Sequence, residues 1–451
     1  MNMASIILAA GKSIRMKSSL PKVLHPLGGK NLLEYSIDTL TQVNNLKPIV
    51  VVGYESELVQ KAIGERAQFV IQEPQLGTAH AVFQTKPLLG GKVDTLLVSY
   101  ADMPLLTLDT YKSLLETHQK YQPVMTLLTL QSAQTRGFGR LIRDERGNPA
   151  AIVEEAVATP QQLAIQELNV GVYCFNANWL WDALPRVPIS PKGEYFLTDL
   201  LAIALSDGKS IQTVNLLDPD EAIGINNRVH LAEAEAVVRK RINTYWMLEG
   251  ITILDPATTY IESPVTIGQD SIILPNTYLK GNTAIGEGCQ IGPNTILSDT
   301  QIGSNCKIIY SVLEKAIVES RVDIGPFAHL RKGAHLAEGV HMGNFGEIKN
   351  SYLGPGTKMG HFSYLGDANI GNEVNIGAGT ITCNFDGVKK NPTEIGDRVF
   401  IGSDTMLVAP VKLGEGSRTG AGAVVTKDIP DYSLAVGVPA RVIRKLAKPD
   451  V

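Results

Sequence analysis

Residues 318–348 read VESRVDIGPFAHLRKGAHLAEGVHMGNFGEI, and this stretch decides the fold of the second half of the chain. Every sixth position holds a large apolar residue: Val318, Ile324, Leu330, Leu336, Met342 and Ile348. A helix repeats its faces every 3.6 residues and a strand every 2, so a period of six predicts one short strand and one turn per hexad. Three such sides close one coil of a parallel β-helix.

The same spacing extends in both directions from this stretch. It passes through Ile261, Ile267, Ile273, Leu279, Ile285 and Ile291 upstream, and through Ile395, Ile401, Leu407 and Leu413 downstream. At about 18 residues per coil, we expect about nine coils, each advancing by about 4.8 Å, the spacing of neighbouring strands. The segment from Cys383 to Glu394 breaks the spacing and is predicted to leave the coil as a loop, a place where rigid scaffolds often carry binding groups.

The first half of the chain has a different rhythm, in which short apolar runs alternate with helical segments. The predicted strands are residues 5–9, 48–52, 69–71, 95–99 and 124–130, and the predicted helices are residues 32–41, 56–63, 79–85 and 108–120. This alternation indicates an α/β domain with a mostly parallel, Rossmann-like sheet. Ligands of such sheets bind beyond the carboxyl ends of the strands.

One long helix is predicted between the two halves. Asn226 and Asn227 can cap its start, Gly250 can end it, and residues 228–249 are rich in Ala, Glu, Arg and Leu. We therefore expect an N-terminal domain at residues 1–226, a linker helix at 227–250 and a β-helix domain at 251–451.

The composition narrows the class of protein. The chain has 451 residues, of which 44% are hydrophobic and 19% charged, so it is long enough to form two domains that each bury a core. Its net charge is −4, and this lack of excess positive charge argues against a nucleic-acid-binding protein. Four cysteines without CxxC spacing argue against a disulfide framework or a zinc ribbon. With no signal-peptide pattern and no apolar run near the roughly 20 residues of a membrane span, a cytoplasmic protein is expected.

The loop after the first predicted strand carries a cluster of cations. Gly11 allows close approach of the backbone to a ligand, and Lys12, Arg15, Lys17 and Lys22 follow within a short stretch. A P-loop is excluded, because its first glycine would fall at Ile6. A simple strand-to-helix turn explains Gly11 but not the cations, so a phosphate-binding loop is favoured.

Two further positions have both a functional and a structural interpretation. Asp102 follows a predicted strand and can hold Mg²⁺ together with substrate phosphates, or it can cap a helix. His361, between Gly360 and Asp367, can act as a proton acceptor in acyl transfer, or it can be a turn residue.

The histidines at 329, 335 and 341 share the spacing of six and raise the question of a zinc site. Residues six apart lie on different sides of a β-helix, and only residues about one coil apart stack. Because Glu347 falls one coil after His329, we expect surface turn residues rather than a zinc site within one chain.

Several motifs resemble the sugar-phosphate nucleotidyltransferase family: Leu8-Ala9-Ala10-Gly11, Arg15-Met16, Leu20-Pro21-Lys22, Gln72 with Leu76-Gly77-Thr78, and Tyr100-Ala101-Asp102. Gly139, Glu154, Gln166–Asn169 and Gly224–Arg228 narrow the resemblance. With the hexapeptide half, essentially the whole chain is similar to the family of bacterial bifunctional N-acetylglucosamine-1-phosphate uridyltransferases and glucosamine-1-phosphate N-acetyltransferases.

This resemblance implies a uridyltransferase site in the N-terminal domain. Mg²⁺ would be held by Asp102 and Asn226, and Arg15 and Lys22 would neutralise transition-state charge. UTP and the sugar would be bound by Leu8, Ala9, Ala10, Gly11, Lys22, Gln72, Gly77, Thr78, Tyr100, Ala101, Asp102, Gly139, Glu154, Asn169 and Asn226. The sequence departs from the family at Ser13-Ile14, where Gly-Thr is usual, and at Ala156, where lysine is frequent.

The resemblance also implies an acetyltransferase site in the β-helix, with His361 as general base. Arg331 and Lys349 would hold the phosphate of glucosamine 1-phosphate, and Tyr364, Asn375 and Asn384 would orient its sugar. Acetyl-CoA would be bound by Ala378, Asn384, Phe385, Ser403, Ala421 and Arg441. Phe385 stands where tyrosine is common, and Arg441 lies slightly later than the family's arginine.

The implied protein is a homotrimer that acetylates glucosamine 1-phosphate and then transfers uridylate from UTP to N-acetylglucosamine 1-phosphate. The Cys383–Glu394 loop would reach toward a neighbouring subunit. Two alternatives keep the fold: a nucleotidyltransferase of other sugar specificity with another acyltransferase, or one with a non-catalytic trimerisation β-helix.

Overall fold

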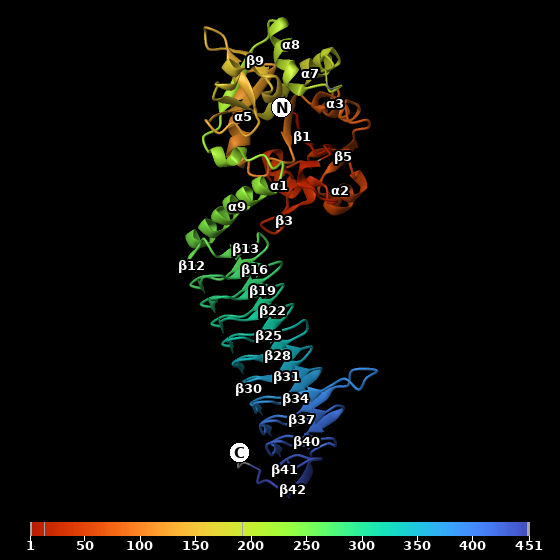
Figure 1. The fold of residues 1–451 in the computed structure, drawn as a ribbon, viewed down its shortest axis with the longest axis vertical. Coiled ribbons are helices and arrows are strands. Elements are labelled where there is room, and N and C mark those ends of the chain that lie inside the picture. The colour runs from red at the N-terminus through yellow and green to blue at the C-terminus, as the bar shows by residue number, and fades with distance from the viewer. Residues whose placement is uncertain (1, 13, 192, 449–451) are drawn as a thin grey trace. The chain divides into compact units, whose positions relative to one another are not determined.

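The computed structural model of the chain describes residues 2–12, 14–191 and 193–448. The chain forms two compact units, Met1–Val238 and Arg239–Val451 (Figure 1). Their boundary falls inside the predicted long helix, which runs over Arg228–Leu248 (α9). Asn227 caps it, because its Oδ1 accepts a hydrogen bond from His230 N at 2.9 Å.

A central sheet organises the N-terminal unit, with strand order β11-β7-β10-β6-β1-β4-β5. The strands are β1 (Met3–Leu8), β4 (Ile49–Val52), β5 (Gln68–Ile71), β6 (Thr95–Tyr100), β7 (Met125–Gln131), β10 (Glu167–Asn176) and β11 (Ile211–Asn215). The pairs β6-β1, β1-β4, β4-β5 and β11-β7 are parallel. The prediction of a mostly parallel sheet is therefore confirmed.

One central strand runs the other way, and sequence patterns did not reveal it. β10 pairs antiparallel with β6 and β7, and β8 (Gly139–Arg143) pairs antiparallel with β9 (Pro149–Val153) and with β10. A continuous apolar run marks a buried strand but carries no information on its direction. β10 matters for the site, because it brings Asn169 next to the strands that carry the ligand loops.

The predicted helices form close to their expected ends. They are α1 (Leu32–Asn44), α2 (Ser56–Ile63), α3 (Thr78–Phe83) and α5 (Leu108–Tyr121). α1 begins with a capping box, in which Asn31 Oδ1 accepts from Glu34 N and Glu34 accepts from Asn31 N. Shorter helices include α7 (Ala177–Ala183) and α8 (Leu200–Ser206), whose buried residues pack on the sheet.

The C-terminal unit is the predicted parallel β-helix, and Figure 1 shows its strands stacked coil upon coil. The first face runs from β12 (Thr252–Ile253) to β42 (Arg441–Lys445), the second from β13 (Tyr260–Ile261) to β40 (Val424–Val425), and the third from β14 (Thr266–Ile267) to β38 (Val411–Leu413). All the apolar residues predicted to point inward are buried in one core.

The coils are shorter and less regular than a uniform 18 residues, so that prediction was wrong in detail. Ile296 pairs with Val312 after 16 residues, Ala284 with Gln301 after 17, and His329 with Glu347 after 18. The missing residues fall at corners and not within strands, because side chains alternate faces along a strand and the loss of one residue there would turn an apolar side chain outward. The stacking of Glu347 on His329 is as predicted.

The predicted loop interrupts one coil. β34 (Ile381–Cys383) and β35 (Thr393–Ile395) bound it, and Figure 1 shows it leaving the β-helix beside β34. Asp386 organises its tip by accepting hydrogen bonds from Lys389 N, Asn391 Nδ2 and Val388 N at 2.8, 2.8 and 2.9 Å. These bonds lower the pKa of Asp386 to about 2. The loop is therefore held in one conformation by its own hydrogen bonds as it projects from the β-helix.

The strand β21 (Lys307–Ile308) offers a test of which positions point inward. Ile308 is fully buried and Lys307 is exposed. The change Ile308→Ala should lower the free energy of unfolding of the β-helix by about 2–5 kcal/mol, because it removes buried methyl groups and leaves a cavity. Lys307→Ala should change it by no more than about 0.5 kcal/mol. Urea denaturation followed by circular dichroism measures both, and equal losses would contradict the inward assignment.

Candidate active sites

The first site lies at the carboxyl ends of two parallel strands in the N-terminal unit. Leu8 ends β1 and is paired with Tyr100, which ends β6. The loop after β1 carries Gly11 and Arg15, and the loop after β6 carries Asp102. Parallel pairing therefore places the phosphate-binding candidates beside the metal-binding candidate, at the edge where such sheets bind ligands.

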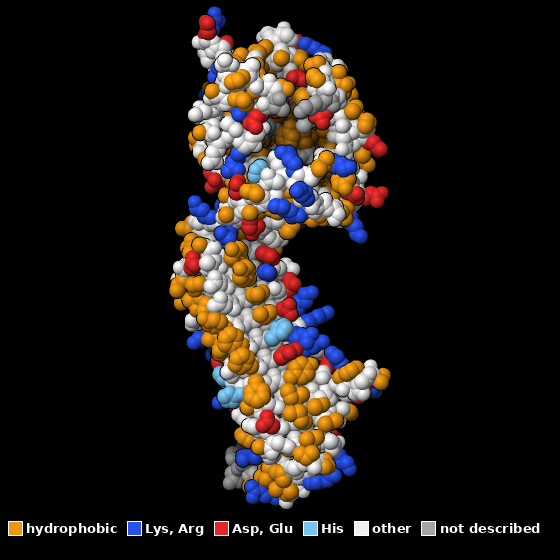
Figure 2. All heavy atoms as spheres, in the orientation of Figure 1, with side chains coloured by type: hydrophobic (Ala, Val, Ile, Leu, Met, Phe, Trp, Pro, Cys, Tyr) orange, Lys and Arg blue, Asp and Glu red, His pale blue; other side chains and the backbone are white. Residues whose placement is uncertain are grey.

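Two adjoining cavities, of about 650 and 750 Å³, hold nearly all the predicted residues. They share Arg15, Thr78, Tyr100, Asp102 and Asn226, so they form one cleft, and Figure 2 shows the hollowed face of this unit. The smaller cavity is also lined by Leu8, Ala9, Ala10, Gly11, Lys22, Gln72 and Gly77, and the larger one by Gly139, Glu154 and Asn169. Ala101 is fully buried and is absent from both linings; its N–H donates to Leu8 O.

Cations and oxygen ligands meet where the two cavities join. Lys22 Nζ lies 2.5 Å from Asp102 Oδ2 and 3.2 Å from Asn226 Oδ1. Arg15 Nη2 also donates to Asn226 Oδ1, at 3.0 Å. The carboxylate and amide oxygens of two distant segments thus converge on one positive charge.

Two phenols line the back of the larger cavity and remain neutral. Burial raises the pKa of Tyr100 well above its usual range, although a hydrogen bond with Thr78 opposes the shift. Burial also raises the pKa of Tyr173, which accepts a hydrogen bond from Asn169 Nδ2 at 2.8 Å. These groups can therefore offer neutral hydrogen bonds to a sugar without adding charge to the cleft.

Some lining residues were missed by sequence reasoning. Glu194 and Phe196 line both cavities and come from a segment that folds over the start of α3. Tyr195 O accepts from Ala79 N at 3.0 Å, and Leu197 N donates to Thr78 Oγ1 at 2.9 Å. More than a hundred residues separate these partners, so no local pattern could have indicated them. Ser13 and the side chain of Ala156 lie outside the described residues.

The second candidate site is a groove of about 670 Å³ on the β-helix. Its lining includes His361, Asn375, Ala378, Ser403 and Ala421. The groove is also lined by three residues that were not predicted, His341, Lys358 and Phe400. These residues form one row with Asn375 on the first face, through the paired strands β27 (His341–Met342), β30 (Lys358–Met359), β33 (Asn375–Ile376) and β36 (Phe400–Ile401). Each of them precedes an inward-pointing residue in its strand, so its side chain points outward. Only the pairing of the strands shows that these outward side chains form one row.

A cluster of cations forms at another corner of the β-helix. Arg331 follows β25 (His329–Leu330) and Lys349 ends β28 (Gly346–Lys349). The ammonium of Lys390 and the guanidinium of Arg331 lower the pKa of Lys349, so these three cations lie close together. Arg331 Nη1 lies 2.8 Å from Glu347 Oε1. Lys390 comes from the projecting loop and was not predicted, since only folding back of that loop brings it to this corner.

Gly366 makes room for the polar groups beside these cations. It ends β31 (Ser363–Gly366) and pairs with Lys349. A Cβ on Gly366 would collide with Tyr364 Oη and would lie 2.6 Å from Asn384 Nδ2. Asn384 Nδ2 in turn donates to Asp367 Oδ2 at 2.6 Å. The absent side chain thus lets Tyr364 and Asn384 converge.

The predicted acetyltransferase residues do not share one cavity within a single chain. His361 lies at the corner before β31, between the first and second faces, whereas Arg331, Lys349 and Asn384 lie at the corner between the second and third faces. Phe385 is 60% exposed on the loop, and Arg441 is exposed on β42, where Nη1 donates to Ala440 O at 3.0 Å. Neither residue lines the groove.

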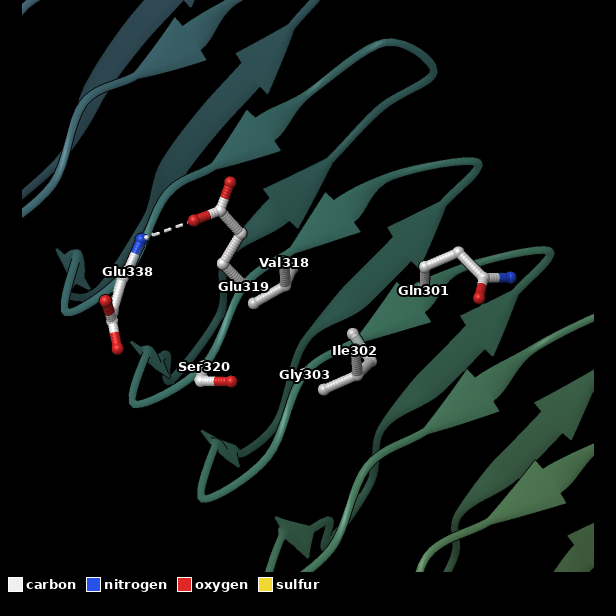
Figure 3. A pocket seen from close by; sticks show the side chains of 7 residues that line it. All are labelled: Gln301, Ile302, Gly303, Val318, Glu319, Ser320 and Glu338. Atoms are coloured by element: carbon white, nitrogen blue, oxygen red, sulfur yellow. Dashed lines mark hydrogen bonds between the residues drawn. The ribbon is translucent and has the colours of Figure 1, made fainter.

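The three histidines spaced by six each face a carboxylate. His329 pairs with Glu314 at 3.3 Å, His335 with Glu319 at 2.8 Å, and His341 with Asp323. In the part of the chain that the structure describes, no group of three or more His, Cys, Asp or Glu side chains forms a metal site. Glu319 also lines a separate groove of about 500 Å³ with Ser320 and Glu338, and Figure 3 shows the hydrogen bond from Glu338 N to Glu319.

An α/β unit with a ligand cleft at its strand ends, followed by a β-helix with a groove and a cation cluster, defines a nucleotidyltransferase joined to a hexapeptide-repeat acyltransferase. Residues 5–168 match the MobA-like NTP transferase domain, and residues 264–299 and 392–427 match the bacterial transferase hexapeptide repeat. The C-terminal unit is accordingly a left-handed parallel β-helix.

Relatives match the chain over nearly its whole length. It is 46% identical to the bifunctional protein GlmU of Heliobacterium modesticaldum, over 96% of this chain and 94% of that protein. It is 46% identical to that of Syntrophomonas wolfei, over 97% of each chain, and 42% identical to that of Exiguobacterium sibiricum, over 100% of each. The chain belongs to the GlmU family.

The prediction of a bifunctional transferase of UDP-N-acetylglucosamine synthesis is therefore confirmed. The enzyme acetylates glucosamine 1-phosphate and then transfers uridylate to the product, which supplies bacterial cell wall synthesis. The alternatives of another sugar specificity or a non-catalytic β-helix are set aside. None of the helices in the described residues combines the length and apolar character that a membrane crossing requires.

The position of Gly366 predicts a selective loss of one activity. Gly366→Ala should reduce acetyl transfer by about tenfold or more, because the new methyl displaces Tyr364 and Asn384 from their present geometry. Uridylyl transfer should be unchanged, since the part of the chain that matches the NTP transferase domain lies in the other unit. Release of CoA and of pyrophosphate from the same preparation measures both, and an unchanged rate of CoA release would contradict the prediction.

Proposed function

We propose that the cleft at the ends of β1 and β6 is the uridyltransferase site and that the groove and cation cluster of the β-helix form the acetyltransferase site. The observation that carries the proposal is the meeting of Arg15, Lys22, Asp102 and Asn226 at the join of two cavities. One cavity accommodates a nucleotide and the other a sugar, so the reacting phosphates would fall between them.

In the proposed uridylyl transfer, the phosphate oxygen of N-acetylglucosamine 1-phosphate attacks the α-phosphorus of UTP and pyrophosphate leaves. The segment Leu8–Gly11, with Gln72, Gly77 and Thr78, holds the nucleotide; the N–H of Ala9 is already used, since it donates to Val51 O. Tyr100, Gly139, Glu154 and Asn169 hold the sugar, and Arg15 and Lys22 neutralise the charge that develops on the phosphates. Such reactions depend on positioning and charge rather than on covalent chemistry.

The residues at the join also suit Mg²⁺. Asp102 and Asn226 offer one carboxylate and one amide oxygen to a single cation, the Lys22 ammonium, which stands in here for a positive charge between them. Mg²⁺ prefers such oxygen ligands and completes its shell with substrate phosphates and water. When bound, it would neutralise phosphate charge, and Lys22 would then be released toward the nucleotide.

In the proposed acetyl transfer, the amine of glucosamine 1-phosphate attacks the thioester carbon of acetyl-CoA. His361 accepts the proton that the amine loses, the C–S bond breaks, and the CoA thiolate takes up a proton. Arg331 and Lys349 hold the sugar phosphate, and Tyr364, Asn375 and Asn384 orient the sugar. Ala378, Ser403 and Ala421 line the path of acetyl-CoA, with Asn384, Phe385 and Arg441 as further contacts.

We propose a homotrimer because one chain separates His361 from the phosphate-binding cations. The corner beside His361 carries an exposed aromatic row of Tyr310, Phe327, Phe345 and Phe362, and ring centroids of Phe327 and Phe345 lie 5.2 Å apart. Figure 2 shows hydrophobic side chains following one another down the β-helix. A neighbouring subunit packed on this row would bring its cation corner to His361.

Two further assignments complete the proposal. The division into residues 1–226, 227–250 and 251–451 follows the α9 helix, which links one activity to the other. A cytoplasmic location is favoured by the co-substrates, since UTP and acetyl-CoA are intracellular metabolites, and by cysteines that are all free among the described residues.

Matched variants should separate the two activities. His361→Ala should lower CoA release by at least about a hundredfold, because the amine loses its proton acceptor, and should leave pyrophosphate release unchanged. Asp102→Asn should do the reverse and should raise the Mg²⁺ concentration for half-maximal uridylyl transfer. Assays that omit glucosamine 1-phosphate, acetyl-CoA, UTP or Mg²⁺ in turn provide the measurement. Loss of both activities in either variant would count against separate sites.

Disruption of the aromatic row should affect only acetylation. Phe327→Asp with Phe345→Asp should yield monomers, and aspartate tolerates the left-handed backbone that both corners have. We expect CoA release to fall at least about tenfold while pyrophosphate release persists. Analytical ultracentrifugation gives the oligomeric state, and a monomer with full acetylation would refute the shared site.

A further inference from the structure

Gln72 faces the nucleotide cavity from the end of β5 and is held from behind by two groups. Its Nε2 lies 2.9 Å from Gly77 O and 3.1 Å from His80 Nδ1, the latter in α3. Gln72 is only 4% exposed. Both hydrogens of its amide nitrogen are therefore used inside the protein.

These contacts determine which way round the amide lies. Gly77 O is an acceptor only, so the amide atom beside it is the nitrogen, and the reversed amide would set two oxygens against each other. One contact fixes the position of Nε2, and the second, to His80, fixes the plane of the amide. Together they fix the direction of Gln72 Oε1.

The same reasoning sets the tautomer of His80. Its Nδ1 accepts from Gln72, so the proton of the neutral ring lies on Nε2. Burial lowers the pKa of His80 from its ordinary value, which favours this neutral form. Gln84 Nε2 lies 2.9 Å from His80 Nε2 and 3.4 Å from His80 O. With the proton on His80 Nε2, the Gln84 amide turns so that its oxygen accepts from the ring, at the expense of the long contact to His80 O.

The remaining atom, Gln72 Oε1, is left for a ligand. No residue in the described ranges donates a hydrogen bond to this oxygen. It is also not one of the fully buried side-chain atoms without a partner, so it remains accessible from the cavity. Because Gln72 lines the smaller cavity, this acceptor of fixed direction would face a nucleobase bound there. Uracil offers a donor, N3–H, on its pairing edge, whereas cytosine offers a lone pair at N3.

We propose that His80 is a positioning residue that holds Gln72 as an acceptor and thereby selects uracil over cytosine in the uridylyl transfer. The inference rests on the proposed placement of the uridine beside Gln72. His80 touches neither the substrate nor the reacting phosphates. It acts by fixing the plane of the Gln72 amide, and Gln84 acts by favouring the ring form of His80 that carries its proton on Nε2.

The test compares nucleotide selection in His80→Ala and His80→Asn. Pyrophosphate release with N-acetylglucosamine 1-phosphate and Mg²⁺ gives kcat/KM for UTP, CTP and dTTP. His80→Ala should lower the ratio for UTP over CTP about tenfold, since one hydrogen bond no longer fixes the amide plane. His80→Asn should restore most of the ratio, because its Oδ1 can accept near the position of Nδ1.

Thymidine triphosphate is the matched control. Thymine has the same N3–H and O4 edge as uracil, so the ratio for UTP over dTTP should stay within about twofold in His80→Ala. Urea denaturation of the N-terminal unit, compared with that of the unaltered protein, reports that the unit containing His80 is folded. An unchanged UTP over CTP ratio, or an equal fall in both ratios, would overturn the inference. Absence of uridylyl transfer in the unaltered protein would instead overturn the proposed function.

A double-variant comparison tests whether His80 acts through Gln72. In a Gln72→Ala background, His80→Ala should cause no further change in the UTP over CTP ratio, because the group that it positions is gone. An additional fall of the same size as in the unaltered background would show an independent role and would overturn the inference.

Discussion

Parallel pairing of strands governs both units of this chain. In the N-terminal unit it brings the ends of β1 and β6 together, so that loops ninety residues apart in sequence share one cleft. In the β-helix it stacks each coil on the next through bonds such as Ile317 N to Ala334 O, at 2.9 Å. Because parallel strands run in the same direction, equivalent positions fall at the same edge or corner, and functional side chains gather there.

Charge is organised in the same way at both sites. Lys22 is paired with Asp102, and Arg331 is paired with Glu347, so one cation at each proposed site has a carboxylate partner. A bound phosphate would compete for these cations with two charges instead of one. Lys349 differs, because the ammonium of Lys390 and the guanidinium of Arg331 lower its pKa, although the carboxylate of Asp367 opposes this shift. Phosphate binding would relieve that repulsion.

The two activities rest on different kinds of site. The cleft proposed for uridylyl transfer lies within one unit and is lined by residues from strands, loops and the segment around Glu194 and Phe196. The residues proposed for acetyl transfer occupy two corners of one β-helix, which is the reason for proposing that a neighbouring subunit completes the site. Placing both on one chain couples their amounts in the cell without requiring any contact between the sites.

The sequence by itself determined the β-helix, the interruption at Cys383–Glu394 and the alternation of strands and helices in the first half, because a spacing of six and alternating apolar runs are local patterns. Motif resemblance supplied most of the cleft residues. Only the tertiary structure decided the direction of β10, the shortened coils, the arrival of Glu194, Phe196 and Lys390 at their sites, and the separation of His361 from Arg331. Each of these depends on contacts between distant segments, and a local pattern carries no record of which distant backbone or side chain will occupy the space beside it.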